Sequence, residues 1–292
     1  MVEISGLIVN ATQVYAEMPL VAKIILYVFM FILGSCIGSF LNVIIYRLPR
    51  GISVVKGHSF CPKCEHKLAP MDLVPFFSWI FLKRKCRYCG DKISARYPLA
   101  ELAGGIMAIL PLVFIKFGII TEWIEWPLVY MVLILLYLVT MIDFDTMTIP
   151  NQLIIALIVP ALFAVYVDYV KFGYADSFFM EILLPHIIGF FVVSVPMWLI
   201  TLIKKEAIGG GDIKLMAVCG FMLGWKLTLF ATFIGIITGG IYGIVLLAQR
   251  KKGKDGHFAF GPFLSLGIII ALLVNNGRLV ELLDWYMTLF RH

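Results

Sequence analysis

The sequence predicts an all-α membrane protein that crosses the bilayer about eight times, with a small cytoplasmic insert between its first and second spans. Of its 292 residues, 61% are hydrophobic and only 14% are charged, and the mean hydropathy is +0.97. Such values are typical of polytopic membrane proteins and exclude an ordinary soluble domain. A third observation, two C-x-x-C motifs in the longest polar stretch, predicts the insert.

Eight apolar runs approach the length of about 20 residues that one crossing requires. They are residues 21–46, 98–120, 127–147, 149–170, 181–203, 213–224, 227–249 and 258–274. The run 213–224 is short, which leaves its depth in the membrane open. Because residues 1–19 include two acids and lack a basic start before an apolar core, we expect no cleavable signal peptide. The first span would then act as its own insertion signal.

Basic residues gather in the polar stretch between the first two runs. From Arg47 to Arg96 there are eleven Lys or Arg residues against three acids. By the positive-inside rule this loop is cytoplasmic, and alternation through eight spans puts the basic clusters at 204–205 and 250–254 on the same side. Orientation and contact with anionic lipid thus explain the net charge of +6, and no nucleic-acid partner is expected.

The insert contains Cys61-x-x-Cys64 and, after 21 intervening residues, Cys86-x-x-Cys89-Gly90. Paired thiolates at this spacing hold one tetrahedral Zn²⁺, and a C-x-x-C beside glycine resembles a zinc-ribbon knuckle. The alternative is two disulfides or redox pairs, but structural disulfides seldom persist in a reducing cytoplasm. We therefore predict a structural Zn²⁺ with four cysteine ligands and no open coordination position.

Acidic residues stand at the ends of two apolar runs. Asp143 and Asp145 follow one run, and Asp212 follows three glycines (209–211) and precedes another. A carboxylate at membrane depth is costly, so it usually faces a cavity and has a partner. Two such carboxylates meeting in one cleft indicate an aspartyl protease. Positions 143 and 145 point about 200° apart on a helix, and Asp143 is expected to be the buried one.

Asp212 directly precedes the run 213–224, where a helix N-cap would lie, and the helix dipole favours an ionised carboxylate there. Two adjacent carboxylates share a proton and titrate as a coupled pair. One activates water as a base and the other, protonated, polarises the scissile carbonyl. As a hypothesis, Asp212 is the ionised partner and Asp143 the acid.

Other polar or small residues have two interpretations each. Gly34 belongs to a small-residue face that lets helices approach closely. Asn42 forms an interhelical hydrogen bond or contacts a substrate or cofactor, and Arg47 ends its helix at the membrane surface. Glu101 pairs with a basic loop residue or binds a cationic group. The apolar segment 73–80 either docks on the bilayer surface or covers a cleft.

Five segments together resemble the type IV prepilin peptidases, bifunctional leader peptidases and N-methyltransferases of the G-x-G-D class of membrane aspartyl proteases. They are GSFLNVIIYRLP (38–49), the two C-x-x-C pairs, RYPLAE (96–101), IDFDTMTIPN (142–151) and GGGDIKL (209–215). The resemblance implies that Asp143, seven residues before Pro150, and Asp212, in the G-x-G-D motif, are the catalytic pair.

The resemblance also implies the substrates and the location. Prepilins and pseudopilins would be cut after a glycine on the cytoplasmic side of the bacterial inner membrane, in partnership with type IV pilus or type II secretion machinery. The new N-terminal residue, usually Phe, would then be methylated with S-adenosylmethionine. The family places this second activity in the N-terminal part, so Gly34, Asn42, Arg47, Glu101 and the cysteine insert are its candidate residues.

The expected organisation is a tail with the first span (1–49), the four-cysteine insert (50–97), a second span associated with methylation (98–126) and a peptidase core (127–292). The main alternative from another class is an ion- or proton-coupled transporter in which Asp143 and Asp212 bind the cation. It has no need of a four-cysteine insert. A peptidase that has lost methylation, or a non-catalytic assembly factor, is a third interpretation.

Overall fold

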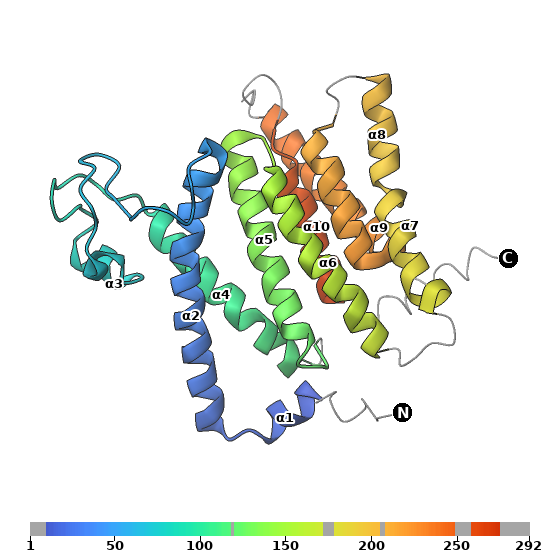
Figure 1. Ribbon diagram of the computed structural model, residues 1–292, viewed down its shortest axis with the longest axis horizontal. Helices are drawn as coiled ribbons and strands as arrows, with labels where there is room; N and C mark the ends of the chain where they lie inside the picture. The colour runs from blue at the N-terminus through green and yellow to red at the C-terminus, as the bar shows by residue number, and fades with distance from the viewer. Residues whose placement is uncertain (1–9, 118–119, 172–177, 205–207, 249–257, 275–292) are drawn as a thin grey trace. The chain divides into compact units, whose positions relative to one another are not determined.

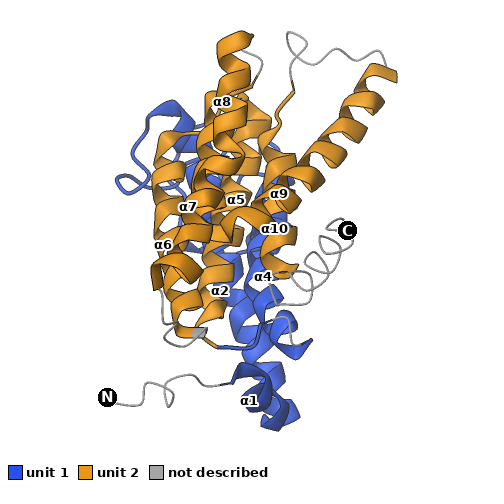
Figure 2. Ribbon diagram, turned by 90° about the vertical axis from the view of Figure 1, so that its right-hand side faces the viewer, with its two compact units in different colours: residues 1–122 blue, residues 123–292 orange. Residues whose placement is uncertain are grey.

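The computed structural model describes residues 10–117, 120–171, 178–204, 208–248 and 258–274 (Figure 1). Within these residues the regular elements are helices, as predicted, and strand-like pairing is limited to three isolated β-bridges. Lys205 and the basic cluster at 250–254 lie outside the described residues. Contacts divide the chain into two compact units, residues 1–122 and 123–292, which Figure 2 colours separately.

The first unit consists of two long helices with a small domain inserted between them. Its long helices are α2 (Leu20–Arg47) and α4 (Arg96–Lys116), preceded by the short α1 (Ala11–Glu17). The insert contains two 3-10 turns, η2 (Leu48–Arg50) and η3 (Pro70–Leu73), and the five-residue helix α3 (Phe77–Phe81). The insert therefore begins after Arg47, the last residue of α2, and ends before Arg96, the first residue of α4.

Glycines bring α2 and α4 into backbone contact. Gly34 lies against the carbonyl of Gly104, and a Cβ atom at Gly38 would stand 2.5 Å from the Ala100 carbonyl oxygen and 2.9 Å from the Glu101 Cα atom. Such close approach is possible only with small residues at the crossing. The small-residue face predicted around Gly34 is confirmed.

We expect Gly34→Leu to destabilise the first unit, because the added side chain would have to occupy the space of the Gly104 backbone. Overpacking of this kind costs about 1–3 kcal/mol. Thermal unfolding of the purified protein in detergent measures the effect. Gly240→Leu is the matched control, since nothing lies within 4 Å of a Cβ atom there. Equal melting temperatures for the two variants would contradict the prediction.

The second unit is a helical bundle in which α9 is the central packing partner. Its helices are α5 (Glu125–Thr146), α6 (Asn151–Lys171), the π-helical η4 (Phe179–Leu183), α7 (Leu184–Val192), α8 (Ser194–Ile203), α9 (Gly210–Ala248) and α10 (Gly261–Val274). Helix α9 packs on α6, α7, α8 and α10, and α10 packs also on α5. The glycines at 235 and 239 allow α10 to approach α9 closely, because they lie against Leu264 and Phe260.

Among the described residues, six helices are long and apolar enough to cross a membrane, and α10 is a shorter apolar helix. The sequence predicts about eight spans because it counts the runs 213–224 and 227–249 separately; the 39-residue α9 contains both runs, as two helices that meet at a kink. The other difference is α10, whose 14 residues reach about 21 Å at 1.5 Å per residue. The membrane class is thus confirmed with a different number of long helices.

Helix α9 has two arms that meet at Gly224, where the backbone turns to φ 73° and ψ 165°. Beyond this bend the Thr228 hydroxyl donates to the carbonyl oxygens of Gly224 at 2.6 Å and Gly220 at 3.3 Å. In a straight helix, residues eight apart are separated by about 12 Å along the axis. The chain therefore folds back at Gly224, in a conformation that favours glycine.

Candidate functional site

Asp143 lies in the last turn of α5 and is only 5% exposed, whereas Asp145 is exposed, as predicted. One Asp143 carboxylate oxygen, Oδ2, accepts a hydrogen bond from the backbone N–H of Gly261 at 2.9 Å. Gly261 is the first residue of α10, 118 positions along the chain. Tertiary packing thus fixes the orientation of this buried carboxylate.

Asp212 lies in the first turn of α9, but it is not the N-cap that the sequence predicts. The helix already begins at Gly210, and the Asp212 N–H donates to the Gly209 carbonyl at 3.1 Å. Gly210 and Gly211 thus form the start of the helix. The carboxylate folds back towards Gly209, so it lies near the N-terminal end of the helix, where the helix dipole favours negative charge.

Ile149 lies beside Gly211, the neighbour of Asp212, and beside Gly261, whose amide binds Asp143. A Cβ atom at Gly211 would stand 2.9 Å from the Ile149 Cβ, and one at Gly261 would stand 3.3 Å from the Ile149 Cδ1 and 2.7 Å from the Asp143 Oδ2. Asp143 and Asp212 are close enough for their charges to interact directly. Two carboxylates brought together from separate helices form the arrangement that aspartyl hydrolysis requires.

A second contact holds the start of α9 against the start of α6. The Lys214 ammonium donates to the Asn151 side-chain oxygen at 2.9 Å. These residues belong to the two segments that carry the acids, GGGDIKL and IDFDTMTIPN. Sequence reasoning used both segments but missed this contact and the Gly261 amide, because neither partner is apparent from spacing along the chain.

We expect Gly261→Ala to lower any activity of the acidic pair by about a hundredfold, the penalty for displacing a reacting group by about 1 Å. The added methyl group would lie 2.7 Å from the Asp143 Oδ2 and would push that carboxylate aside. Initial rates at saturating substrate measure the effect, with Gly240→Ala as control because its Cβ atom meets nothing within 4 Å. Equal rates for both variants would show that this contact does not position Asp143.

The four cysteines form one cluster in the insert. Their sulfur atoms lie within 4.8 Å of one another, and Cys61 Sγ and Cys89 Sγ are 3.9 Å apart. Four thiolates at about 2.3 Å around a tetrahedral ion are about 3.8 Å from each other, so this donor set fits a metal of that size. None of the four is in a disulfide.

Two similar turns build this cluster. Cys61 N–H donates to the His66 carbonyl, and Cys86 N–H donates to the Asp91 carbonyl. Burial raises the pKa of the Cys61 thiol, but hydrogen bonds from the backbone amides of Cys64 and Lys63 outweigh it and lower that pKa to about 7. A substantial fraction of Cys61 is therefore thiolate, the form that binds metal, at neutral pH.

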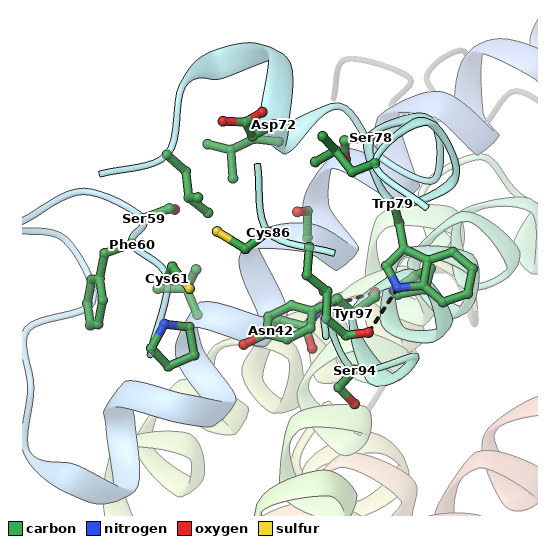
Figure 3. Close-up of a pocket in the computed structure, with 18 of the residues that line it drawn as sticks. Asn42, Ser59, Phe60, Cys61, Asp72, Ser78, Trp79, Cys86, Ser94 and Tyr97 are labelled. Atoms are coloured by element: carbon green, nitrogen blue, oxygen red, sulfur yellow. Dashed lines mark hydrogen bonds between the residues drawn. The ribbon is translucent and has the colours of Figure 1, made fainter. Parts of the chain in front are cut away.

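A cavity of about 350 Å³ lies between the insert and the ends of α2 and α4 that the insert connects. Its size is within the range of small-molecule sites. Figure 3 shows Cys61 and Trp79 at opposite ends of the lining, with Asn42 and Tyr97 between them. The cavity adjoins the cysteine cluster and combines aromatic with charged side chains, including Arg47 and Glu101.

The candidate residues of the first unit differ in what they do in this cavity. Asn42 donates through Nδ2 to the Tyr97 carbonyl at 3.3 Å, which is the interhelical hydrogen bond expected, and it also lines the cavity. The Arg47 guanidinium binds three backbone carbonyls of the insert, those of Ser53, Lys56 and His58, at 3.0–3.1 Å. Its visible role is to fix the loop that leads to Cys61.

Gly34 does not line the cavity, because it is occupied in the contact with Gly104. Glu101 does line it and is 8% exposed. One of its oxygens, Oε2, accepts a hydrogen bond from the Phe76 backbone N–H at 2.9 Å. Of the four candidates Gly34, Asn42, Arg47 and Glu101, Glu101 is the acidic side chain, and it lines the cavity.

Two family models match the chain, and each falls within one structural unit. The model described as the Bacterial Peptidase A24 N-terminal domain matches residues 32–117, and that of the Type IV leader peptidase family matches residues 128–244. A relative from Bacillus subtilis (strain 168), named prepilin leader peptidase/N-methyltransferase, is 35% identical over 85% of this chain and 94% of its own. The chain belongs to the type IV leader peptidase family.

Two further relatives in this family carry the same name. The one from Aeromonas salmonicida (strain A449) is 29% identical over 88% of this chain and 92% of its own, and the one from Pseudomonas aeruginosa is 30% identical over 83% and 88%. No solved structure matches the chain significantly. These family relationships give no support to the transporter alternative.

The family models separate the two sets of residues described above. The cysteine cluster and the cavity belong to the part matched by the N-terminal domain, and Asp143 and Asp212 to the part matched by the leader peptidase family. Sequence analysis placed Phe76 and Trp79 in the apolar segment 73–80, but it did not predict that Phe76 binds Glu101 or that Trp79 and Tyr97 line the cavity. Aromatic residues at a membrane surface are common enough that their presence alone carried no signal.

Proposed function

We propose that this protein is a membrane-embedded aspartyl endopeptidase that removes the leader peptide of prepilins and pseudopilins after a glycine, and then N-methylates the new N-terminal residue, usually Phe. The names of its relatives and the family match support both activities. The observation that carries the peptidase is the meeting of Asp143 with Asp212 around Ile149.

In this mechanism the two carboxylates share one proton. The Gly261 amide donates to Asp143, and Asp212 lies in the first turn of α9, where the helix dipole favours negative charge. The ionised member takes a proton from water as the water oxygen attacks the scissile carbonyl carbon. The protonated member donates to the carbonyl oxygen. As the peptide bond breaks, the carboxyl that took the proton from water gives it to the leaving nitrogen, and the other carboxylate takes back a proton from a hydroxyl of the intermediate.

We assign methylation to the cavity of the first unit. S-adenosylmethionine, when bound, supplies the electrophilic methyl group. Glu101 is suited to hold the new N-terminal ammonium and to take its proton, which frees the nitrogen lone pair for attack. Tyr46, Trp79 and Tyr97 provide aromatic faces that attract cations and bases. The cavity fits a ligand of this class in size and in chemistry.

We further propose that the metal is structural Zn²⁺, bound by Cys61, Cys64, Cys86 and Cys89. The basic residues around the insert favour a cytoplasmic location for it, and an active site at the cytoplasmic side of the bacterial inner membrane. The partners would then be membrane lipid and the type IV pilus or type II secretion machinery that uses the processed subunits.

Mass spectrometry of a purified prepilin incubated with the solubilised protein tests both activities. With S-adenosylmethionine present, we expect loss of the leader and a gain of one methyl group on the mature N-terminus. Cleavage without methylation would leave only the peptidase. An intact prepilin, given folded protein and a cognate substrate, would overturn the proposed function.

We expect Glu101→Gln to lower methylation by about a hundredfold, in the range for loss of a group that transfers a proton. The glutamine oxygen can still accept from the Phe76 N–H, so the local fold is kept while the charge is lost. Leader cleavage, read from the same mass spectra, should not change. Glu65→Gln, at an exposed position of the same insert, is the control. A Glu101→Gln protein that methylates normally would remove Glu101 from the proposed reaction.

A further inference from the structure

The helix α3 of the insert presents an unusually apolar surface. Phe77, Ile80 and Phe81 are 60%, 61% and 78% exposed, and Met71, just before this helix, is 74% exposed. An exposed cluster of large apolar side chains marks a binding surface in a folded protein. The position of α3 relative to α2 indicates which partner covers this apolar surface.

The residue before α3 is held deep along α2 and not at its end. The Phe76 ring stacks on the Phe31 ring with 6.0 Å between centroids. Phe31 lies sixteen residues before Arg47, the last residue of α2, which is about 24 Å along the helix axis. Phe76 also donates its backbone N–H to Glu101, which lies more than one turn into α4. The chain of the insert therefore returns alongside the two long helices.

The backbone conformation of Phe76 also indicates that its contacts hold this residue in place. Phe76 has φ 59° and ψ −50°, a conformation that a bulky L-residue keeps only where its contacts hold it. Those contacts are the Glu101 carboxylate and the Phe31 ring. The start of α3 is thus anchored at the depth of the apolar part of α2.

At the same level α2 itself exposes large apolar side chains. Phe29 and Ile32, on either side of Phe31, are 60% and 58% exposed, in a helix apolar enough to cross a membrane. Basic residues follow α3 directly at Lys83, Arg84 and Lys85, and the Arg84 guanidinium lies 4.8 Å from the centre of the Trp79 ring. Apolar residues followed by Trp and basic residues are typical of a helix at the membrane interface.

We propose that α3 is a membrane anchor of the insert: Phe77, Ile80 and Phe81 bind the acyl chains of the bilayer, and Lys83–Lys85 contact anionic headgroups. The anchor holds the insert, with its cavity and cysteine cluster, against the membrane. This proposal does not depend on either proposed activity, because it rests on the position of α3 beside α2.

Photo-crosslinking of the full-length protein in nanodiscs of phosphatidylethanolamine and phosphatidylglycerol tests the proposal. Benzoylphenylalanine replaces Phe81 in one variant and Val55 in the other. Val55 is a matched control, because it is 86% exposed and lies in the loop that Arg47 binds at the end of α2. We expect at least tenfold more phospholipid adduct, measured by mass spectrometry, at position 81.

Equal adduct at both positions, or none at position 81, would overturn the proposal. The same reaction is repeated with a prepilin in the nanodisc. Phospholipid adduct that persists at position 81 supports the anchor, whereas replacement of that adduct by a crosslink to the prepilin shows that the surface binds substrate and refutes it. Zinc content and leader cleavage of both variants, compared with the unmodified protein, establish that they are folded.

Discussion

Replacement of Asp143 or Asp212 by Asn is expected to abolish leader removal, with a fall in rate of at least about a thousandfold. Asn has nearly the shape of Asp, but it can neither take a proton from water nor lend one to a carbonyl oxygen, and such proton transfer contributes about 10²- to 10⁴-fold. Because the two carboxylates act as one unit, the double variant should be no slower than either single variant.

The control for this prediction is Asp145→Asn, which changes the same residue type two positions from Asp143 at an exposed site. Its cleavage rate should stay within about threefold of the unmodified protein, as for a surface residue outside the reacting pair. Each variant must also accumulate in the membrane. A folded Asp143→Asn or Asp212→Asn protein that still cuts prepilin would falsify the assignment of the pair.

Removal of the metal is expected to unfold the insert and stop methylation while leader cleavage continues. A structural Zn²⁺ contributes about 10–16 kcal/mol of binding energy to the fold around it. The double variant Cys61→Ser/Cys86→Ser removes the two buried ligands. We expect its zinc content, measured by elemental analysis, to fall from one ion per chain to none, and proteases to cut between residues 51 and 95. Cleavage of prepilin continues because Asp143 and Asp212 are packed in the other unit.

Cys36→Ser is the matched control, because Cys36 is a free and exposed cysteine of α2 outside the cluster. It should retain the metal, the protease resistance and both activities. A metal-free double variant that methylates at the normal rate would show that the cluster does not support the methylation site. If the purified protein were fully loaded with a different metal, the assignment of the metal as zinc would be wrong, but the four-cysteine site would not.

Much of the fold was predictable because membrane helices depend on local composition. The apolar runs, the four-cysteine insert and the burial of Asp143 in preference to Asp145 all follow from periodicity and spacing. The break at Gly224 was also predictable, since the apolar runs 213–224 and 227–249 meet there and correspond to the two arms of α9. The N-cap expected at Asp212 was wrong, because Gly210 and Gly211 can adopt helical angles as easily as extended ones.

The sequence predicted which residue types make up the candidate site, but it did not predict most of the contacts that orient them. Spacing identified the acids and the cysteines, whose chemistry is distinctive. The partners that orient them are backbone groups, such as the amides of Gly261 and Phe76 and the carbonyls bound by Arg47. Every residue carries such groups, so only tertiary structure reveals which of them are used.

The fold-back at Gly224 has a consequence for the surrounding lipid. The first arm of α9, residues 210–223, is about 21 Å long, whereas the hydrocarbon layer of a bilayer is about 30 Å thick. A helix this short is accommodated by local thinning of the bilayer. Because Asp212 lies in the first turn of this arm, we expect hydrophobic mismatch to draw headgroups and water towards it. A peptide entering from the polar side would then have a shorter distance to travel to the carboxylates.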